Sequence, residues 1–242
     1  MKNPSCALFD PGSPPGGVRE GPAGVQPLHV AGRPGPESRA AGRGRRWRYI
    51  TILFSDLCGS VALGEALDAP DYVRAVQHLR AVTRRVVAAG GGTIARLQGD
   101  GVLVFFHGDA GPQEDARRAM ACALALHAAV RARAGGWPLA LHSGIHAGVT
   151  YLDDGDIERG RYDLIGCTPN IAARLAALAG RDQILASDVV LRGHAASFLT
   201  QGMKPVRLRG CAQPLPTCEV VGFGHGDCAG VGWGDAPARL HA

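Results

Sequence analysis

The sequence predicts an α+β sandwich, in which helices cover one face of a sheet, and three observations lead to this prediction. A strand-like apolar run ends at Asp56. Two later segments, about 70–89 and 113–133, carry apolar residues at steps of three and four, as amphipathic helices do. Between these helices, two apolar runs flank residues 99–101, whose sequence Gly-Asp-Gly predicts a β-hairpin.

The other elements follow from local signals. Pro70 suits the first turn of the first helix, and the glycines at 90–92 end that helix. Residues 138–152 predict a strand with tight spots at Gly144 and Gly148. A polar loop is expected at 153–161, a short strand at 162–166 and a third helix at 169–179. Three short strands follow, around Ile184, Val206 and Val220.

The charge distribution divides the 242-residue chain into three parts. Residues 1–48 contain eight basic and three acidic residues, so they account for the whole net charge of +5. We therefore predict a disordered Pro/Gly/Arg-rich arm over 1–46, a neutral folded domain over 47–222 and a flexible Gly-rich tail over 223–242. Because the folded part is neutral, nucleic acid is not expected as its partner, and binding through the arm is left as an alternative.

Composition also bears on the compartment. No apolar run approaches the roughly 18 residues of a membrane span, and the N-terminus lacks the apolar segment of a secretory signal. The seven cysteines include no CxxC pair, which indicates reduced thiols. We expect a cytoplasmic protein with no membrane partner.

Asp56 and Asp100 are the candidate metal ligands. Each lies at the end of a predicted strand, and if the two strands are neighbours the carboxylates can converge at one edge of the sheet. Magnesium takes oxygen ligands and needs only one or two protein carboxylates. The alternative for Asp100 is an ordinary hairpin turn with a solvated carboxylate.

Two further segments carry polar groups suited to a nucleotide. Gly59 and Ser60 follow Asp56 and would leave backbone N–H groups free for phosphate oxygens at a helix start. Asn170 and Arg174 are four residues apart and share one helix face, where an amide and a guanidinium suit a ribose and a phosphate. The alternative is an arginine that pairs with an acid such as Asp163.

Four segments, in this order and with these separations, resemble the class III adenylate/guanylate cyclase catalytic domain. They are ITILFSDLCGS, RLQGDGVLVFF, GIHAG and YDLIGCTPNIAARL, and the resemblance covers about residues 47–222. It implies a ferredoxin-like (βαββαβ-type) nucleotidyl cyclase sandwich. It also implies conversion of ATP to cyclic AMP and pyrophosphate in a homodimer, with metal aspartates from one subunit and the Asn/Arg helix from the other.

The resemblance also implies roles for individual residues. Asp56 and Asp100 match the ligands of two Mg²⁺ or Mn²⁺ ions, with the Leu57 carbonyl as a further ligand. Asn170 matches the ribose-orienting asparagine and Arg174 the transition-state arginine.

Three other positions match groups that bind the rest of the nucleotide. Asp163 matches a purine-reading position, and Arg96 stands where adenylate cyclases usually carry the lysine that reads adenine. Arg209 is expected near the triphosphate-binding lysine.

Two rival functions remain at this point. Because arginine and lysine are not interchangeable, Arg96 keeps cyclic GMP synthesis from GTP as an alternative. The other alternative is a degenerate cyclase homology domain that only binds nucleotide or a partner. The four residues Asp56, Asp100, Asn170 and Arg174 argue against it, because a domain without catalysis has no chemical reason to keep them.

Overall fold

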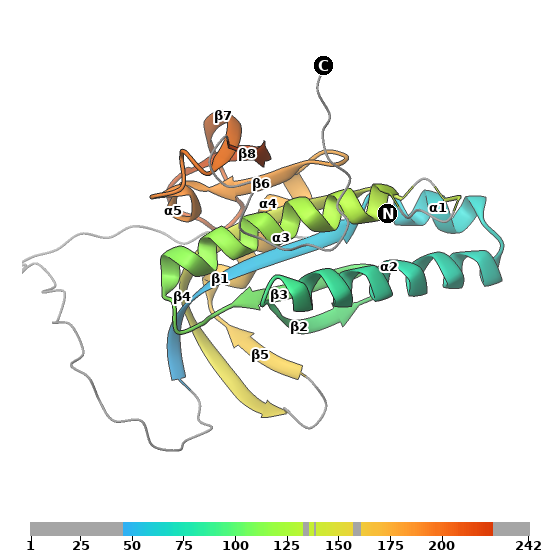
Figure 1. The fold of residues 1–242 in the computed structure, drawn as a ribbon, viewed down its shortest axis with the longest axis horizontal. Coiled ribbons are helices and arrows are strands. Elements are labelled where there is room, and N and C mark those ends of the chain that lie inside the picture. The colour runs from blue at the N-terminus through green and yellow to red at the C-terminus, as the bar shows by residue number, and fades with distance from the viewer. Residues whose placement is uncertain (1–45, 133–135, 138, 157–160, 225–242) are drawn as a thin grey trace, which may run out of the picture. The chain divides into compact units, whose positions relative to one another are not determined.

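A computed structural model of the chain describes residues 46–132, 136–137, 139–156 and 161–224 (Figure 1). The predicted arm and tail lie outside this part except at their inner ends, where Arg46 belongs to the first strand and Phe223 to the last, so the folded domain extends one residue further at each end than predicted. The elements, in chain order, are β1 (Arg46–Leu57), α1 (Ser60–Ala66), α2 (Ala69–Ala89), β2 (Thr93–Gln98), β3 (Gly101–Phe106), α3 (Pro112–Ala132), β4 (Leu141–Asp156), β5 (Arg161–Ile165), α4 (Cys167–Leu178), β6 (Ile184–Ser187), α5 (Asp188–Leu191), β7 (Phe198–Val206) and β8 (Leu215–Phe223).

The strands form one eight-stranded mixed sheet. Its order is β2-β3-β1-β4-β6-β8-β7, and β5 pairs with the far half of β4. β1 lies in the middle and pairs antiparallel with both β3 and β4. The predicted hairpin of β2 and β3 is confirmed, with Gln98 and Gly101 as its last paired residues.

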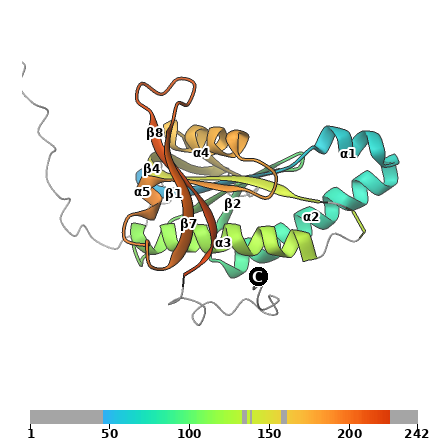
Figure 2. The same ribbon diagram turned by 90° about the horizontal axis from the view of Figure 1, so that it is seen from above.

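The helices lie on both faces of the sheet, as Figure 2 shows. The long helices α2 and α3 share one face, as predicted, whereas α4 packs against β4 and β1 on the other. Gly144 allows this close approach, because a Cβ there would lie 2.1 Å from the carbonyl oxygen of Ala172. The α+β class is thus confirmed, but the prediction that helices cover only one face is wrong, because the helix predicted at 169–179, α4, packs on the second face.

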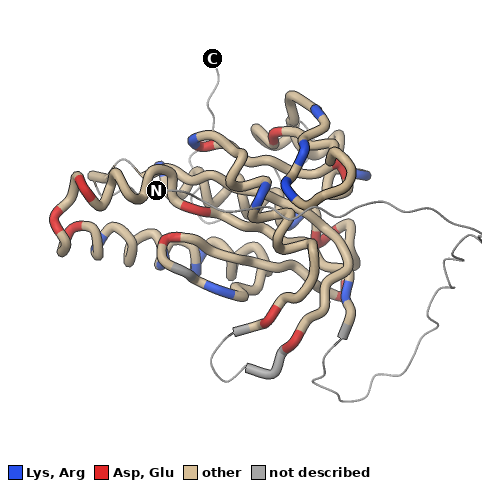
Figure 3. The backbone as a smooth tube through the Cα atoms, turned by 180° about the vertical axis from the view of Figure 1, so that it is seen from behind, with Lys and Arg blue, Asp and Glu red and all other residues tan. Residues whose placement is uncertain are grey.

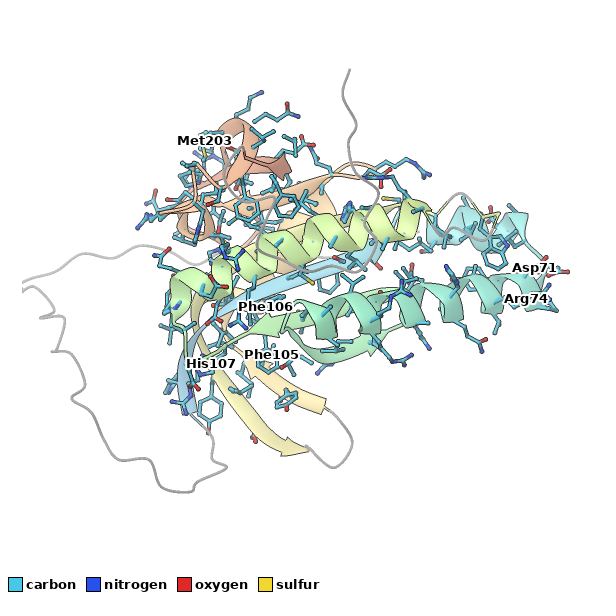
Figure 4. All side chains as sticks on the ribbon, viewed as in Figure 1. Asp71, Arg74, Phe105, Phe106, His107 and Met203 are labelled. Atoms are coloured by element: carbon cyan, nitrogen blue, oxygen red, sulfur yellow. The ribbon has the colours of Figure 1, made fainter. Side chains whose placement is uncertain are left out.

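Neighbouring residues of β3 show how the sheet separates two cores (Figure 4). Phe106 is fully buried in the main core, under α2 and α3. Phe105 points to the opposite face, where it belongs to a smaller core with Ile50, Ile52 and Ala172. The ring of Phe105 meets that of Tyr162 edge to face at 5.0 Å, which brings β5 over the end of β3.

Three features differ from the sequence prediction. β4 continues through residues 153–156, which were expected in a loop, because these residues pair with β5. The short helix α5 was not predicted, and for α1 only a helix start at Gly59 and Ser60 was expected; α1 buries none of its residues, so it has no buried apolar stripe. Among the described residues, no helix combines the length and apolar character that a membrane crossing requires.

Candidate active site

Asp56 lies near the end of β1, half-buried, beside the β2–β3 turn. The backbone N–H of Leu57 donates to its Oδ1 at 3.1 Å. Burial raises the pKa of Asp56 and the nearby charge of Asp100 raises it further, while the Leu57 hydrogen bond and His142 act in the opposite direction. Asp100 therefore lies near enough for its charge to influence this pKa, and a shared metal site at the two carboxylates remains a prediction.

Asp100 occupies the second central position of the hairpin turn. The first position needs a positive φ, which Gly99 supplies at 61°. One carboxylate oxygen of Asp100, Oδ2, is buried and has no hydrogen-bond partner. A buried, unpartnered carboxylate oxygen is costly unless a cation or a donor reaches it.

This pair fits a hard cation. Two carboxylates close enough to repel each other, one with an unpartnered oxygen, are the protein donors that Mg²⁺ or Mn²⁺ takes when water and phosphate fill its other positions. In the described part of the chain, no group of three or more His, Cys, Asp or Glu side chains could hold a metal alone. Leu57 ends β1 beside Asp56, and its carbonyl remains a predicted ligand.

Gly59 lies in the turn between β1 and α1, directly before Ser60. Gly59 has a left-handed backbone with φ 66°, and a Cβ built there would meet no atom within 4 Å. Ser60 is the first residue of α1. The space around Gly59 is therefore open, and the phosphate role of these residues remains a prediction.

Arg96 of β2 and Asp163 of β5 lie together. Arg96 Nη2 is 3.9 Å from Asp163 Oδ1, and both side chains are more than half exposed. The two strands meet here because Phe105 and Tyr162 pack beneath them. An exposed ion pair of this kind contributes little to stability, so both groups can turn to a ligand.

α4 presents Asn170 and Arg174 on one side. Asn170 is exposed, and its Nδ2 donates to the Gly166 carbonyl at 3.2 Å. Arg174 is half-buried and lies against the connection between β7 and β8, with Nη1 4.0 Å from Cys211 Sγ. A Cβ on Gly210 would lie 3.4 Å from the same nitrogen. Arg209, the residue before Gly210, is exposed in that connection, so its segment of chain lies beside Arg174.

Within one chain, the predicted metal ligands and the predicted groups of α4 form two separate groups, beside the Arg96–Asp163 pair. Asp56 and Asp100 form the first, and α4 with the β7–β8 connection forms the second. Among the described residues, no hydrogen bond or ion pair joins Asp56 or Asp100 to Asn170 or Arg174. Charged positions of both signs are interspersed along the described backbone (Figure 3).

Two neighbours of the site were not predicted. His142 pairs in register with Asp56, and its Nδ1 hydrogen-bonds the Ala176 carbonyl of α4 at 2.6 Å. Arg80 of α2 donates to the carbonyl oxygen of Gly99, in the turn that carries Asp100. In both contacts a side chain reaches a backbone carbonyl of another element, and no local sequence pattern predicts such a contact.

The family of this fold follows from comparison with known proteins. The family model described as the adenylate and guanylate cyclase catalytic domain matches residues 44–219. This match covers most of the chain, so the protein belongs to that family. It contains a class III nucleotidyl cyclase domain, from a family that uses divalent metal ions.

Solved structures of cyclases are similar to this chain. The guanylyl cyclase Cya2 is 29% identical with a TM-score of 0.70, and the comparison covers 78% of this chain and 99% of Cya2. The adenylyl cyclase CyaB from P. aeruginosa is 26% identical with a TM-score of 0.68, covering 74% and 96% of the two chains. The adenylate/guanylate cyclase/hydrolase from Silicibacter pomeroyi is 26% identical with a TM-score of 0.58, covering 73% and 98%. No curated protein matches the chain significantly.

Proposed function

We propose that this protein is a homodimeric cyclase that converts ATP to cyclic AMP and pyrophosphate. The observation that carries this proposal is the convergence of Asp56 and Asp100. Burial and mutual repulsion raise the pKa of Asp56, and Asp100 Oδ2 has no partner. Such a pair is poorly stabilised by the protein itself, which supports its use as a ligand for cations.

Asp56, Asp100 and the Leu57 carbonyl would hold two Mg²⁺ or Mn²⁺ ions. Bound there, the ions would lower the pKa of the ribose 3′-hydroxyl and neutralise charge on the triphosphate. The open turn at Gly59 and Ser60 leaves room for phosphate oxygens beside these carboxylates.

α4 supplies the groups that orient the substrate. Asn170 is exposed and can exchange its weak 3.2 Å bond to Gly166 for the ribose. Arg174 contacts Cys211 and lies beside Gly210, and no carboxylate among the described residues binds its guanidinium, so this group can stabilise charge on the α-phosphoryl group during in-line attack. Arg209 extends the same positive surface toward the remaining phosphates.

The two groups of residues belong to different sites in the proposed dimer. Each site would take Asp56 and Asp100 from one subunit and Asn170 and Arg174 from the other, as the family resemblance implies. Both sites of a two-fold dimer would then be equivalent, since the same surfaces are used twice.

The base is read by Arg96 and Asp163 in this proposal. The Asp163 carboxylate can accept from the amino group of adenine, and Arg96 can donate to a ring nitrogen. GTP is the second candidate substrate, and the observation that favours it is Arg96 itself, because the arginine fork matches the two acceptors on the edge of guanine.

The decisive experiment incubates the purified chain with ATP and GTP, separately and in competition, in excess Mn²⁺, and identifies the cyclic product by mass spectrometry. Asp56→Asn and Asp100→Asn should abolish turnover, since an amide is a poor ligand for a hard cation. Asp109→Asn is the matched control, because Asp109 is exposed in the loop before α3.

Each outcome bears on a different part of the proposal. Near-normal turnover of either variant in saturating Mn²⁺ would show that the metal assignment is wrong. If the wild-type protein forms neither cyclic nucleotide, the proposed activity itself is wrong.

A further inference from the structure

Arg80, near the middle of α2, binds the turn that carries Asp100. Its guanidinium donates two hydrogen bonds to the carbonyl oxygen of Gly99, from Nη2 at 2.6 Å and from Nε at 3.2 Å. Both donors belong to one rigid planar group. The two bonds therefore fix the direction of this carbonyl as well as its position.

The direction of the Gly99 carbonyl decides which kind of turn forms. Gly99 and Asp100 are the two central residues, since Gln98 and Gly101 are the last paired residues of the hairpin. Gly99 has φ 61°, whereas Asp100 has a negative φ, because Asp182 is the one described residue other than glycine with a positive value. A positive φ followed by a negative φ belongs to a turn of type II′.

The sequence alone leaves a second turn open. Rotating the peptide between Gly99 and Asp100 by half a turn gives type I′, in which the second central residue also has a positive φ. Aspartate tolerates that conformation better than most residues. The rotated peptide would turn its carbonyl away from Arg80 and give Asp100 a positive φ, which changes the side-chain rotamers that Asp100 can adopt.

We propose that Arg80 is a positioning residue for the metal site, because it holds the Gly99 carbonyl and so keeps Asp100 directed at Asp56. This inference rests on the proposed metal role of the two aspartates. Asp100 Oδ2 has no hydrogen-bond partner of its own, so the conformation of the turn determines where this carboxylate lies. Arg80 therefore acts through the backbone and does not touch the substrate or the ions.

The positive charge of Arg80 and its hydrogen bonds to Gly99 predict opposite effects on metal binding when Arg80 is removed. A cation near a metal site repels the metal, so removing it should tighten metal binding if charge were its main influence. Removing a clamp that orients a ligand should weaken metal binding. The direction in which metal affinity changes therefore shows whether Arg80 acts mainly through its charge or through its hydrogen bonds to the turn.

The test measures Mn²⁺ binding to the full-length protein by isothermal titration calorimetry, without nucleotide. Arg80→Met should raise the Mn²⁺ dissociation constant about tenfold, the loss expected for a charge-assisted hydrogen bond that is partly exposed. Arg80→Lys keeps the charge but replaces the fork with a point donor, and should give a smaller rise. Arg84→Met removes an exposed arginine one helical turn later, with no hydrogen bond or ion pair to any described residue, and should leave the constant unchanged.

A second readout follows the turn itself. Hydrogen exchange of the backbone amides in 97–103 should be faster in Arg80→Met than in the wild type or Arg84→Met. If the substitution destabilised the protein as a whole, exchange would also become faster outside this hairpin. Circular dichroism checks that each variant is folded, and if Arg80→Met unfolds, Arg80→Lys carries the test.

The proposed positioning role of Arg80 is overturned if the wild-type protein binds Mn²⁺ and Arg80→Met binds it equally well or more tightly. It is also overturned if both Arg80 variants unfold while Arg84→Met does not, since Arg80 would then support the whole fold. A wild-type protein that binds Mn²⁺ but makes no cyclic nucleotide would refute the proposed activity and leave the clamp standing. Failure of the wild type to bind Mn²⁺ would refute both.

Discussion

Replacing Gly144 with alanine should displace α4 from the sheet. The added Cβ would lie 2.1 Å from the Ala172 carbonyl oxygen and 2.4 Å from the Ala176 nitrogen, both backbone atoms of α4. These atoms cannot rotate away, so β4 and α4 must separate by roughly 1.3 Å to restore an ordinary contact. Overpacking of this kind costs about 3 kcal/mol, the upper part of its usual range.

The displacement should reduce activity as well as stability. α4 carries Asn170 and Arg174, and a shift of about 1 Å in a catalytic group typically costs about 100-fold in rate. We therefore expect a melting temperature lower by roughly 6–12 °C and a kcat lower by about two orders of magnitude.

Thermal unfolding followed by circular dichroism, together with the cyclase assay, measures both effects. Gly222→Ala is the matched control, because its Cβ would make an ordinary contact at 3.8 Å with the Leu199 side chain. It should change stability by no more than about 0.5 kcal/mol. If Gly144→Ala keeps both the wild-type melting temperature and wild-type kcat, α4 does not pack against β4 as the structure describes.

Three further predictions concern the base, the dimer and pH. Arg96→Lys should raise the ratio of kcat/KM for ATP over GTP, and an unchanged ratio would mean that Arg96 does not face the base. Mixing the inactive Asp56→Asn and Arg174→Ala proteins should restore about a quarter of wild-type activity, because half of the dimers are mixed and each has one intact site; no recovery, with subunit exchange shown independently, would place each site within one chain. Burial lowers the pKa of His127 to about 4, so its neutral form is favoured in the folded state and its contribution to stability is lost as pH falls from 6.5 toward 4. Over that window the wild type should lose about 1.4 kcal/mol of unfolding free energy per pH unit relative to His127→Gln, as measured by chemical denaturation at several pH values. If the unfolding free energies of the two proteins fall equally with pH, His127 is not a buried neutral imidazole.

Much of the fold follows from local patterns. The apolar periodicity of α2 and α3 and the Gly-Asp-Gly turn predicted elements that the structure contains. Gly144 and Gly148 indicated tight spots, and both lie under α4, at Ala172 and Thr168. The sequence could not show that α4 occupies the second face, because a helix with an apolar stripe packs equally well on either side of a sheet.

The limits of sequence reasoning lie where tertiary contacts override local preference. Aspartates are depleted in strands, so residues 153–156 predicted a loop, yet pairing with β5 extends β4 through them. The positions of Asp56 and Asp100 could be predicted because each ends an apolar run. Arg80 and His142 could not, because their roles depend on which backbone carbonyl each side chain reaches in the folded chain.

A second buried carboxylate in the same chain shows what structural use of an aspartate looks like. Asp115 is 1% exposed, forms an ion pair with Arg118, and accepts from the Gly108 N–H at 3.3 Å. Its charge is therefore compensated within the fold, which makes a buried carboxylate tolerable. Asp56 receives a single backbone N–H, and Asp100 Oδ2 receives no donor from the described residues. Two nearby carboxylates with so little compensation reduce stability unless a cation binds them, and this contrast supports a functional rather than a structural role for the pair.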